Sequence, residues 1–344
     1  MALSEQFKKG IDDLLDGNYS TVIDHVIDTK PIPADIYNKD FFYSRRTEAI
    51  DLVACLDPSK ATTARGSLYF KRDGSSVGIK VLGYMSSYDH LGVKMHRLLA
   101  VALHALTQRV PGLGSVDADN ACLVHIPLAD YAYAIHKGHY DCADDKKITA
   151  RRKEDRKITR REVKAVIETL EKIVITRDAD PADPAGDFAD LHLVTSAGLS
   201  ENDIFIEFDS RFVNYITGQR TLYRYPTALL SLDARSQLAY ALGCRLYAYA
   251  GYFRPQDAII KLNIRKLLKY LPIPDPDGDY VKTHAWRSVL RDPLEAALNS
   301  LVAARIIKHW DYAPPGEAPD KDSYLASCIT YTIHVSEDPV LPEV

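Results

Sequence analysis

The segment KKITARRKEDRKITRREVKAVIETLEK, residues 146–172, determines the predicted fold of this chain. It holds eleven Lys or Arg residues against five Asp or Glu residues, a net charge of about +6 in a protein whose formal net charge is −4. Its second half and the two residues after it have apolar residues at helical spacing: Val163, Val166, Ile167, Leu170, Ile173 and Val174. An amphipathic helix with a local cationic stripe is typical of a surface that binds a polyanion.

The start of this helix has a sequence signal of its own. Thr159-Arg160-Arg161-Glu162 matches a capping box, in which the threonine and glutamate side chains each accept a backbone amide of the first turn. The match predicts that the helix begins at Arg160. Arg161, Lys164 and Glu168 then lie opposite the apolar stripe, so the first turn is expected to be exposed and cationic.

Further helices and strands precede and follow the basic helix. Alternating residues 68–71 and 77–82 flank an Asp73-Gly74 turn signal and predict a hairpin. Residues 93–110 predict a buried helix, 122–126 a short strand, and 128–135 a second helix. After an acidic loop at 178–190, residues 191–195 and 204–208 predict a hairpin around Gly198. The order from residue 93 is helix, strand, helix, basic helix, hairpin.

The same order recurs in the last third of the chain. A helix ends at Gly251, residues 259–262 predict a strand, and Asn263 is a favourable N-cap for the next helix. A longer helix is expected from Trp286 to Arg305, with Pro293 kinking it or marking its true start. Strands at 306–312 and 324–335 complete the unit. The apolar spacing of the helix after Asn263 repeats that of residues 128–135 at an offset of 136 residues.

A helix, a strand, two helices and a hairpin describe a winged helix, a variant of the helix-turn-helix. The predicted fold class is α+β, with two tandem winged-helix domains and an N-terminal extension. We expect an acidic extension at 1–62, a first winged-helix domain at 63–217 and a second, DNA-binding one at 218–344. Residues 1–57 hold six basic and eleven acidic residues, which favours an extension outside the core.

Composition places the chain among soluble globular proteins of more than one domain. It has 344 residues, of which 46% are hydrophobic and 26% charged. No apolar run approaches the roughly 20 residues that cross a bilayer, and no secretory signal opens the chain, so a cytoplasmic protein without membrane contact is expected. The five cysteines are scattered and predict no disulfide or zinc site.

Enzymatic chemistry finds no support in the sequence. Phosphate loops of the Gly-x-x-x-x-Gly-Lys-Ser/Thr type, Gly-x-Gly-x-x-Gly, His-x-His and Gly-x-Ser-x-Gly are all absent. His136, His139, Asp141 and Cys142 crowd together, but without a second ligand pair they predict a polar loop. We therefore expect no catalytic residue, no metal and no cofactor, with a nuclease using an unrecognised metal site as an alternative.

The DNA contacts are predicted from basic residues on and beside the two reading helices, whose N-termini favour phosphates and whose Arg side chains can pair with guanine edges. Residues 245–310 carry eleven basic and six acidic side chains. The tryptophans Trp286 and Trp310 are predicted core anchors. The predicted DNA-binding residues are Arg151, Arg152, Arg156, Lys157, Arg160, Arg161, Lys164, Lys261, Arg265, Arg287, Ser288 and Arg291.

Residues 93–335 resemble the replication initiator (Rep) proteins of iteron plasmids. The resemblance is carried by Leu-Asp-Ala-Arg-Ser-Gln from Leu232, Leu-Asn-Ile-Arg-Lys-Leu-Leu from Leu262, and Trp-Arg-Ser-Val-Leu-Arg-Asp-Pro-Leu from Trp286. It implies tandem winged-helix domains, binding to direct repeats in double-stranded origin DNA, and recruitment of the host replication initiator and helicase. The acidic extension and the acidic loop depart from that pattern.

Two alternatives remain open from the sequence. A winged-helix transcriptional repressor would bind one inverted site as a dimer rather than several direct repeats. A protein-binding scaffold would act through the acidic extension and loop, so its activity would survive charge reversal at Arg160 and Arg161. Whether the protein is a monomer or a homodimer is also open.

Overall fold

The structure is a computed structural model that describes residues 41–45, 48–56, 62–64, 67–71, 77–82, 91–109, 123–137, 145–177, 191–213, 222–250, 258–316 and 318–334. Several predictions lie outside these residues: the first 40 residues of the extension, the Asp73-Gly74 turn, the acidic loop at 178–190, and His139, Asp141 and Cys142.

The first half of the chain builds one helix-and-sheet unit around the predicted basic helix. The structure confirms the predicted order, with α4 (Leu91–Arg109), β5 (Leu123–Pro127), α6 (Leu128–Ile135), α7 (Asp145–Leu170), β8 (Val194–Leu199) and β9 (Asp203–Phe208). The three strands form an antiparallel sheet in the order β5-β9-β8. Val124 and Ile126 alternate inward opposite Ile206 and Ile204, so one face of this sheet is buried.

The second half repeats this arrangement. Its elements are α9 (Gln237–Ala250), β11 (Ile260–Asn263), α10 (Ile264–Leu268), α11 (Asp279–Thr283), α12 (Asp292–Ala303), β12 (Ile307–Ala313), α13 (Lys321–Ala326) and β13 (Cys328–Ile333). The sheet order β11-β13-β12 matches β5-β9-β8. The Asn263 side chain accepts a hydrogen bond from the Lys266 amide, which confirms the predicted N-cap.

The predicted strand at 324–335 was wrong at its start. Residues up to Ala326 form the short helix α13, because the Asp320 side chain accepts the Ser323 amide and begins a helix there. Neither α13 nor α11 was predicted. Six and five residues are too few to show a helical period in the sequence.

A five-stranded antiparallel sheet lies below the first unit. It consists of β2 (Thr62–Ala64), β3 (Ser67–Lys71), β4 (Val77–Val81), β6 (Ile173–Arg177) and β7 (Leu191–His192). The predicted hairpin is confirmed as β3 and β4. Ile173 and Val174 were wrongly predicted to lie on the basic helix. That helix ends at Leu170, and β-branched residues follow in β6, where they pair with β4.

Residues 41–45 and 48–56, inside the predicted extension 1–62, pair and pack with the rest of the chain. Strand β1 (Phe41–Arg45) pairs with β10 (Leu222–Pro226), and helix α3 (Glu48–Ala54) buries Ile50, Leu52 and Val53. The acidic balance of the first 57 residues concealed this apolar stretch. The domain boundaries at 62/63 and 217/218 stay predictions, although the β1–β10 pairing crosses both of them.

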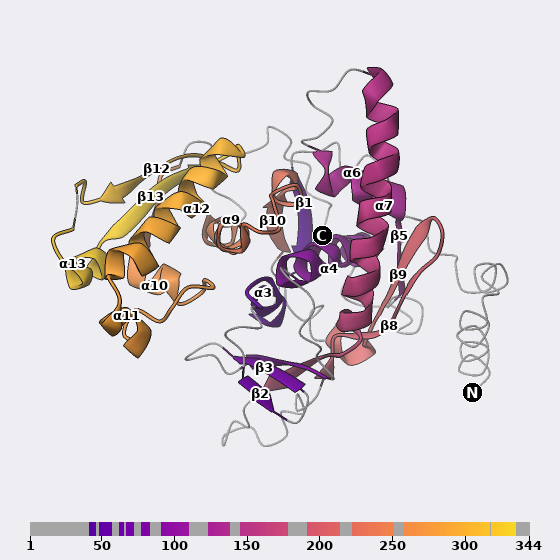
Figure 1. Ribbon diagram of the computed structural model, residues 1–344, viewed down its shortest axis with the longest axis horizontal. Helices are drawn as coiled ribbons and strands as arrows, with labels where there is room; N and C mark the ends of the chain where they lie inside the picture. The colour runs from indigo at the N-terminus through magenta and orange to yellow at the C-terminus, as the bar shows by residue number, and fades with distance from the viewer. Residues whose placement is uncertain are drawn as a thin grey trace.

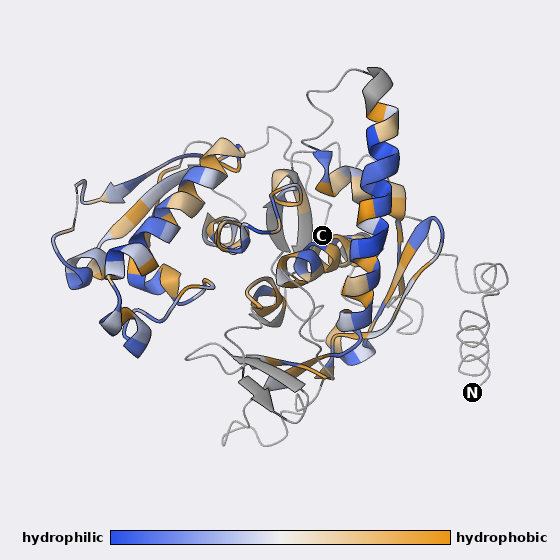
Figure 2. Cartoon of the chain, in the orientation of Figure 1, coloured by the Kyte–Doolittle hydropathy of each residue, from blue (hydrophilic) through white to orange (hydrophobic). Residues whose placement is uncertain are grey.

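Figure 1 shows the two units side by side, with α3, α4 and α9 between them. The apolar faces of these helices are buried in one continuous core. In Figure 2 the polar surface of α7 continues upward past the end of α6, where the helix leaves the body. A helix with the length and apolar character that a bilayer crossing requires is absent from the described part of the chain.

Candidate nucleic-acid interface

Helix α7 is a single helix of 26 residues, so the predicted start at Arg160 is wrong. Thr159 lies in the middle of the helix and is fully buried. Its Oγ1 is 3.1 Å from His136 Nε2, at the end of α6, instead of accepting an amide of its own helix. The capping box fails because the neighbouring helix occupies the threonine hydroxyl.

One face of α7 packs against the rest of the protein. Asp155 is buried, and its carboxylate lies 4.0 Å from His136 Nδ1. Below this junction Val163, Val166 and Leu170 enter the core. From Asp155 onward the helix therefore cannot rotate, and its opposite face is fixed toward solvent.

The exposed face of α7 carries four cations, which we call the α7 ridge: Lys153, Lys157, Arg161 and Lys164. Steps of four, four and three residues place them on one side of the helix. Lys157 lies 3.9 Å from Glu154, and both of these side chains are more than 60% exposed. Within the described residues, no ion pair involves Lys153, Arg161 or Lys164. Three of the four ridge cations thus face solvent without an ion-pair partner among the described residues, and Lys157 has one exposed partner.

Arg156 and Arg160, also predicted as DNA contacts, lie on a different side of α7. Arg160 Nη1 donates to the carbonyls of Ser200, at 2.6 Å, and Glu201, at 2.9 Å. Arg156 donates to the Asn202 side chain. Both arginines hold the turn between β8 and β9, the wing of this unit. Their geometry assigns them to positioning the wing; a direct DNA contact stays a prediction.

The predicted hairpin was centred on Gly198 and missed this turn. Gly198 lies within β8, whereas the chain reverses at Ser200–Asn202. Ser200 Oγ accepts the amide of Asp203, which closes the turn. The run Ser-Glu-Asn-Asp was the signal that could have located it, because these side chains bond readily to nearby amides.

Arg151 and Arg152 lie in the first half of α7, before the buried Asp155. Both are exposed. The guanidinium carbon of Arg152 is 5.5 Å from the ring centroid of Tyr133, on α6. This contact holds the Arg152 side chain against α6.

In the second unit, α12 occupies the position that α7 has in the first. A π-helical turn at Arg287–Arg291 runs directly into it, so the helical stretch begins at Trp286 as predicted, and Pro293 lies in the first turn of its α-helical part. Trp286 packs on Tyr324 with ring centroids 5.2 Å apart, as a core anchor. Trp310 also packs on the core and donates to Asn299.

The predicted DNA-binding residues on the π-helical turn Arg287–Arg291 differ in their surroundings. Arg287 and Ser288 are exposed, although the Ser288 hydroxyl donates to the Ala285 carbonyl. Arg291 Nε donates to Glu295 at 2.7 Å, and its side chain is only 14% exposed. Glu295 also accepts from the Tyr312 hydroxyl; burial, together with this bond, raises the pKa of Tyr312. The charge of Arg291 is therefore largely neutralised.

The remaining two predicted residues lie on β11 and on the short helix α10. Lys261 is exposed on β11, whereas Arg265 pairs with Asp277 at 2.6 Å and lies 3.8 Å from Asp322. The exposed positions of α12 itself are Asp292, Ala296, Asn299, Ser300 and Ala303. The exposed face of α12 is therefore much less cationic than the α7 ridge.

A metal site is not apparent in the described residues, which contain no group of three or more His, Cys, Asp or Glu side chains placed to hold an ion. His136, from the predicted cluster, is engaged with Asp155 and Thr159 on α7.

Comparison with known proteins finds a likeness of fold. No protein-family model matches the chain, and no curated protein matches it. Among solved structures, the chain is similar to a Pi initiator protein, whose crystal structure was determined in complex with iteron DNA. The TM-score is 0.54 at 16% sequence identity, covering 87% of this chain and 99% of that chain. The predicted resemblance to plasmid initiators is thus confirmed at the level of fold.

Proposed function

We propose that this protein binds double-stranded DNA sequence-specifically through two tandem winged-helix domains and acts as a replication initiator of a plasmid or mobile element. Helix α7 reads DNA in the first domain and α12 in the second. The repeated strand orders β5-β9-β8 and β11-β13-β12 support the tandem arrangement. Initiation would bring the host replication initiator and helicase to origin repeats in the cytoplasm. The protein itself is proposed to perform no covalent chemistry.

The α7 ridge is the observation that carries this proposal. Its residues span eleven steps of helix, about 17 Å at 1.5 Å per residue. A major groove about 12 Å wide accepts one helix, and phosphates line both of its edges. Cations along an outward helix face, with the opposite face locked into the core, fit this groove without any rearrangement of the body.

The fold supports the same conclusion with less weight, because one fold serves many functions. The similar solved structure is an initiator protein with iteron DNA. The DNA binding seen in that crystal structure is a property of that protein. For this chain, the ridge provides the electrostatic reason to expect a nucleic acid.

Selection of bound duplexes from a random-sequence pool at about 150 mM salt, near physiological ionic strength, tests the proposal. We expect one motif long enough for two reading helices. Direct repeats of that motif next to the protein's own gene support an initiator, whereas a single inverted site identifies a repressor. Recovery of no motif contradicts sequence-specific binding.

The salt dependence of binding provides a second test. About 6 to 10 phosphate contacts would weaken binding by roughly a thousandfold or more between 50 and 200 mM salt. An affinity that stays constant over this range contradicts an electrostatic interface.

A further inference from the structure

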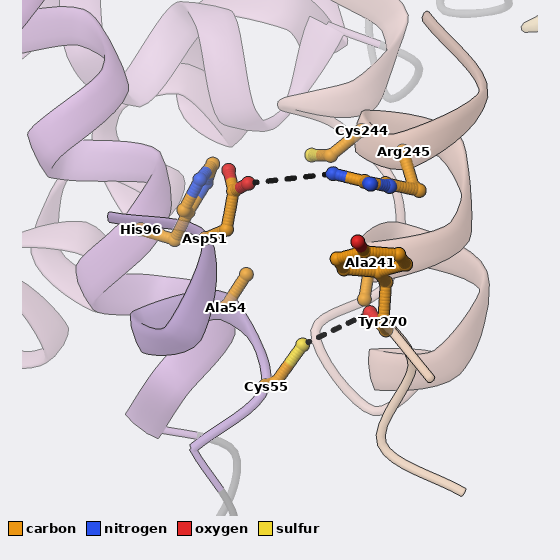
Figure 3. A pocket seen from close by; sticks show the side chains of 8 residues that line it. All are labelled: Asp51, Ala54, Cys55, His96, Ala241, Cys244, Arg245 and Tyr270. Atoms are coloured by element: carbon orange, nitrogen blue, oxygen red, sulfur yellow. Dashed lines mark hydrogen bonds and ion pairs between the residues drawn. The ribbon is translucent and has the colours of Figure 1, made fainter. Parts of the chain in front are cut away.

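A set of polar contacts joins the two units across the surface between α3 and α4 on one side and α9 on the other. These contacts involve residues far apart in the sequence, and none belongs to the reading helices. We call Asp51, Gln237 and Arg245 the inter-unit latch. Figure 3 shows two of them, Asp51 and Arg245, facing each other across the junction.

Gln237 caps a helix of the other unit. Its Nε2 donates to the carbonyl of Ala54 at 3.3 Å and to that of Leu56 at 3.0 Å. The last carbonyls of a helix such as α3 have no partner within the helix itself. A side chain at the start of α9 therefore satisfies the end of α3 and sets the distance between the two helices.

Arg245 forms the second part of the latch. Its guanidinium carbon lies 3.4 Å from the ring centroid of Tyr270 and 4.5 Å from that of Tyr249, and Nη1 is 4.0 Å from Asp51 Oδ2 (Figure 3). The side chains of Arg245 and Asp51 are only 18% and 14% exposed. Two aromatic rings and one carboxylate thus restrict the position of this cation.

Close packing surrounds these contacts. The hydroxyl of Tyr240 on α9 is 2.8 Å from His96 Nδ1 on α4, and Arg97 donates to the Leu232 carbonyl. The pocket between Asp51, His96, Cys244 and Tyr270 has a volume of only about 10 Å³. A gap of this size holds at most about one water molecule, so the units meet through filled space.

Rigid contacts lead from the latch to both reading helices. On one side, α4 packs on α7 and its Lys94 pairs with Glu162 of α7 at 2.9 Å. On the other, α9 packs directly on α12. Packed protein interiors transmit displacement because they contain few voids. The packed contacts that run from α7 through α4, the latch and α9 to α12 therefore fix the separation of the two reading helices.

We infer that Asp51, Gln237 and Arg245 determine which spacing between the two halves of a DNA site the protein accepts. This inference rests on the proposed function. DNA repeats its groove every 10 to 10.5 base pairs, so five inserted base pairs turn one half-site to the opposite side of the duplex. A protein whose two reading helices have a fixed separation can then bind only one half-site at a time. It loses the gain in affinity that comes from binding both half-sites with one chain, about 10²- to 10⁴-fold.

The test measures affinity for the selected duplex and for duplexes with one to six base pairs inserted between its halves. The full chain is compared with two latch variants, Gln237→Ala and the double variant Asp51→Ala with Arg245→Met. The double variant removes both charges together, which avoids leaving one buried and unpaired. Asp279→Ala with Lys282→Met, which removes an exposed 2.9 Å pair on α11, is the matched control.

The unaltered protein and the control should lose about a hundredfold or more in affinity at the five-base-pair insertion. The latch variants should bind the original spacing more weakly and lose at most about tenfold over the series. Gln237→Ala carries the test if the double variant does not give a native circular dichroism spectrum.

Two results overturn the inference while leaving DNA binding intact: a folded latch variant with the same spacing profile as the unaltered protein, or an unaltered protein that is indifferent to the insertions. Failure of the unaltered protein to bind any selected duplex is a different outcome, which overturns the proposed function itself.

Discussion

Two adjacent arginines on α7, Arg160 and Arg161, have the same chemistry and opposite surroundings. Arg160 is turned toward the wing and donates to two backbone carbonyls. Arg161 is exposed on the ridge and forms no ion pair with another described residue. One residue along a helix rotates a side chain by about 100°, which is enough to separate a positioning role from a contact role.

Replacing Arg160 with Ala is expected to destabilise the fold. Two carbonyls of the wing turn lose a charged donor, and the free energy of unfolding should fall by about 1 to 2 kcal/mol. Urea denaturation followed by circular dichroism measures this change. DNA affinity should fall without a change in its salt dependence, because the wing moves while no phosphate contact is removed.

Arg161→Ala is the matched control, with the opposite expected pattern. Its free energy of unfolding should change by less than about 0.5 kcal/mol, since the side chain is on the surface. If Arg161 pairs with a base, DNA binding should weaken by about 1 to 3 kcal/mol on one preferred sequence. If Arg161 contacts a phosphate, binding to all sequences should weaken by the same amount. Equal effects of both variants on stability would contradict the assignment of the two arginines.

At the scale of elements, the helices α7 and α12 occupy equivalent places in the two units but differ in charge. The α7 ridge has four cations, while α12 offers mainly small or neutral side chains outward and neutralises Arg291 with Glu295. Most of the salt-dependent affinity should therefore come from α7. Sequence discrimination by α12 would depend on shorter contacts, such as those of Arg287 and Ser288.

Changing Lys157, Arg161 and Lys164 together to Gln tests the contribution of the ridge. Each lost phosphate contact reduces the slope of log affinity against log salt by about 0.9, so the triple variant should lose about 2.7 from the slope. Titrations between about 50 and 200 mM salt measure it. The helix should remain folded, because Gln is nearly as good a helix former as Lys or Arg. An unchanged slope would place the DNA elsewhere.

Local pattern predicted most of these elements, and its failures have physical reasons. The helices at 93–110 and 128–135, the hairpins and the Asn263 cap follow from periodicity and turn chemistry within a few residues. The start of α7 does not follow from local pattern, because the Thr159 hydroxyl bonds to His136 of the neighbouring helix end rather than within its own helix. The strand β6 was assigned to the helix before it, since Ile173 and Val174 continue the apolar spacing.

The candidate site was predicted in composition but not in arrangement. The basic residues of 146–172 are on α7, yet only the bonds to the Ser200–Asn202 turn separate Arg156 and Arg160 from the ridge. The inter-unit latch was not predicted. Asp51, Gln237 and Arg245 are nearly 200 residues apart at the extremes, and no short motif marks a pair that meets only after folding.

At the scale of the whole molecule, β1 and α3 connect the two units. Leu52 is fully buried in α3, between α4 and α9. Leu52→Ala should lower the free energy of unfolding by about 2 to 5 kcal/mol, the range for a large side chain removed from a packed core. Equilibrium denaturation measures the loss. A change below about 0.5 kcal/mol would favour the predicted extension over the core assignment.

The pairing of β1 with β10 has a consequence for synthesis on the ribosome. Phe41–Arg45 emerges early, but its hydrogen-bonding partner Leu222–Pro226 is made about 180 residues later. Until then β1 has an unpaired edge that invites association with other chains. Domains usually fold one after another as they leave the ribosome. Here the first unit stays incomplete until the second has begun, so a nascent chain halted near residue 217 would depend on chaperones to remain soluble.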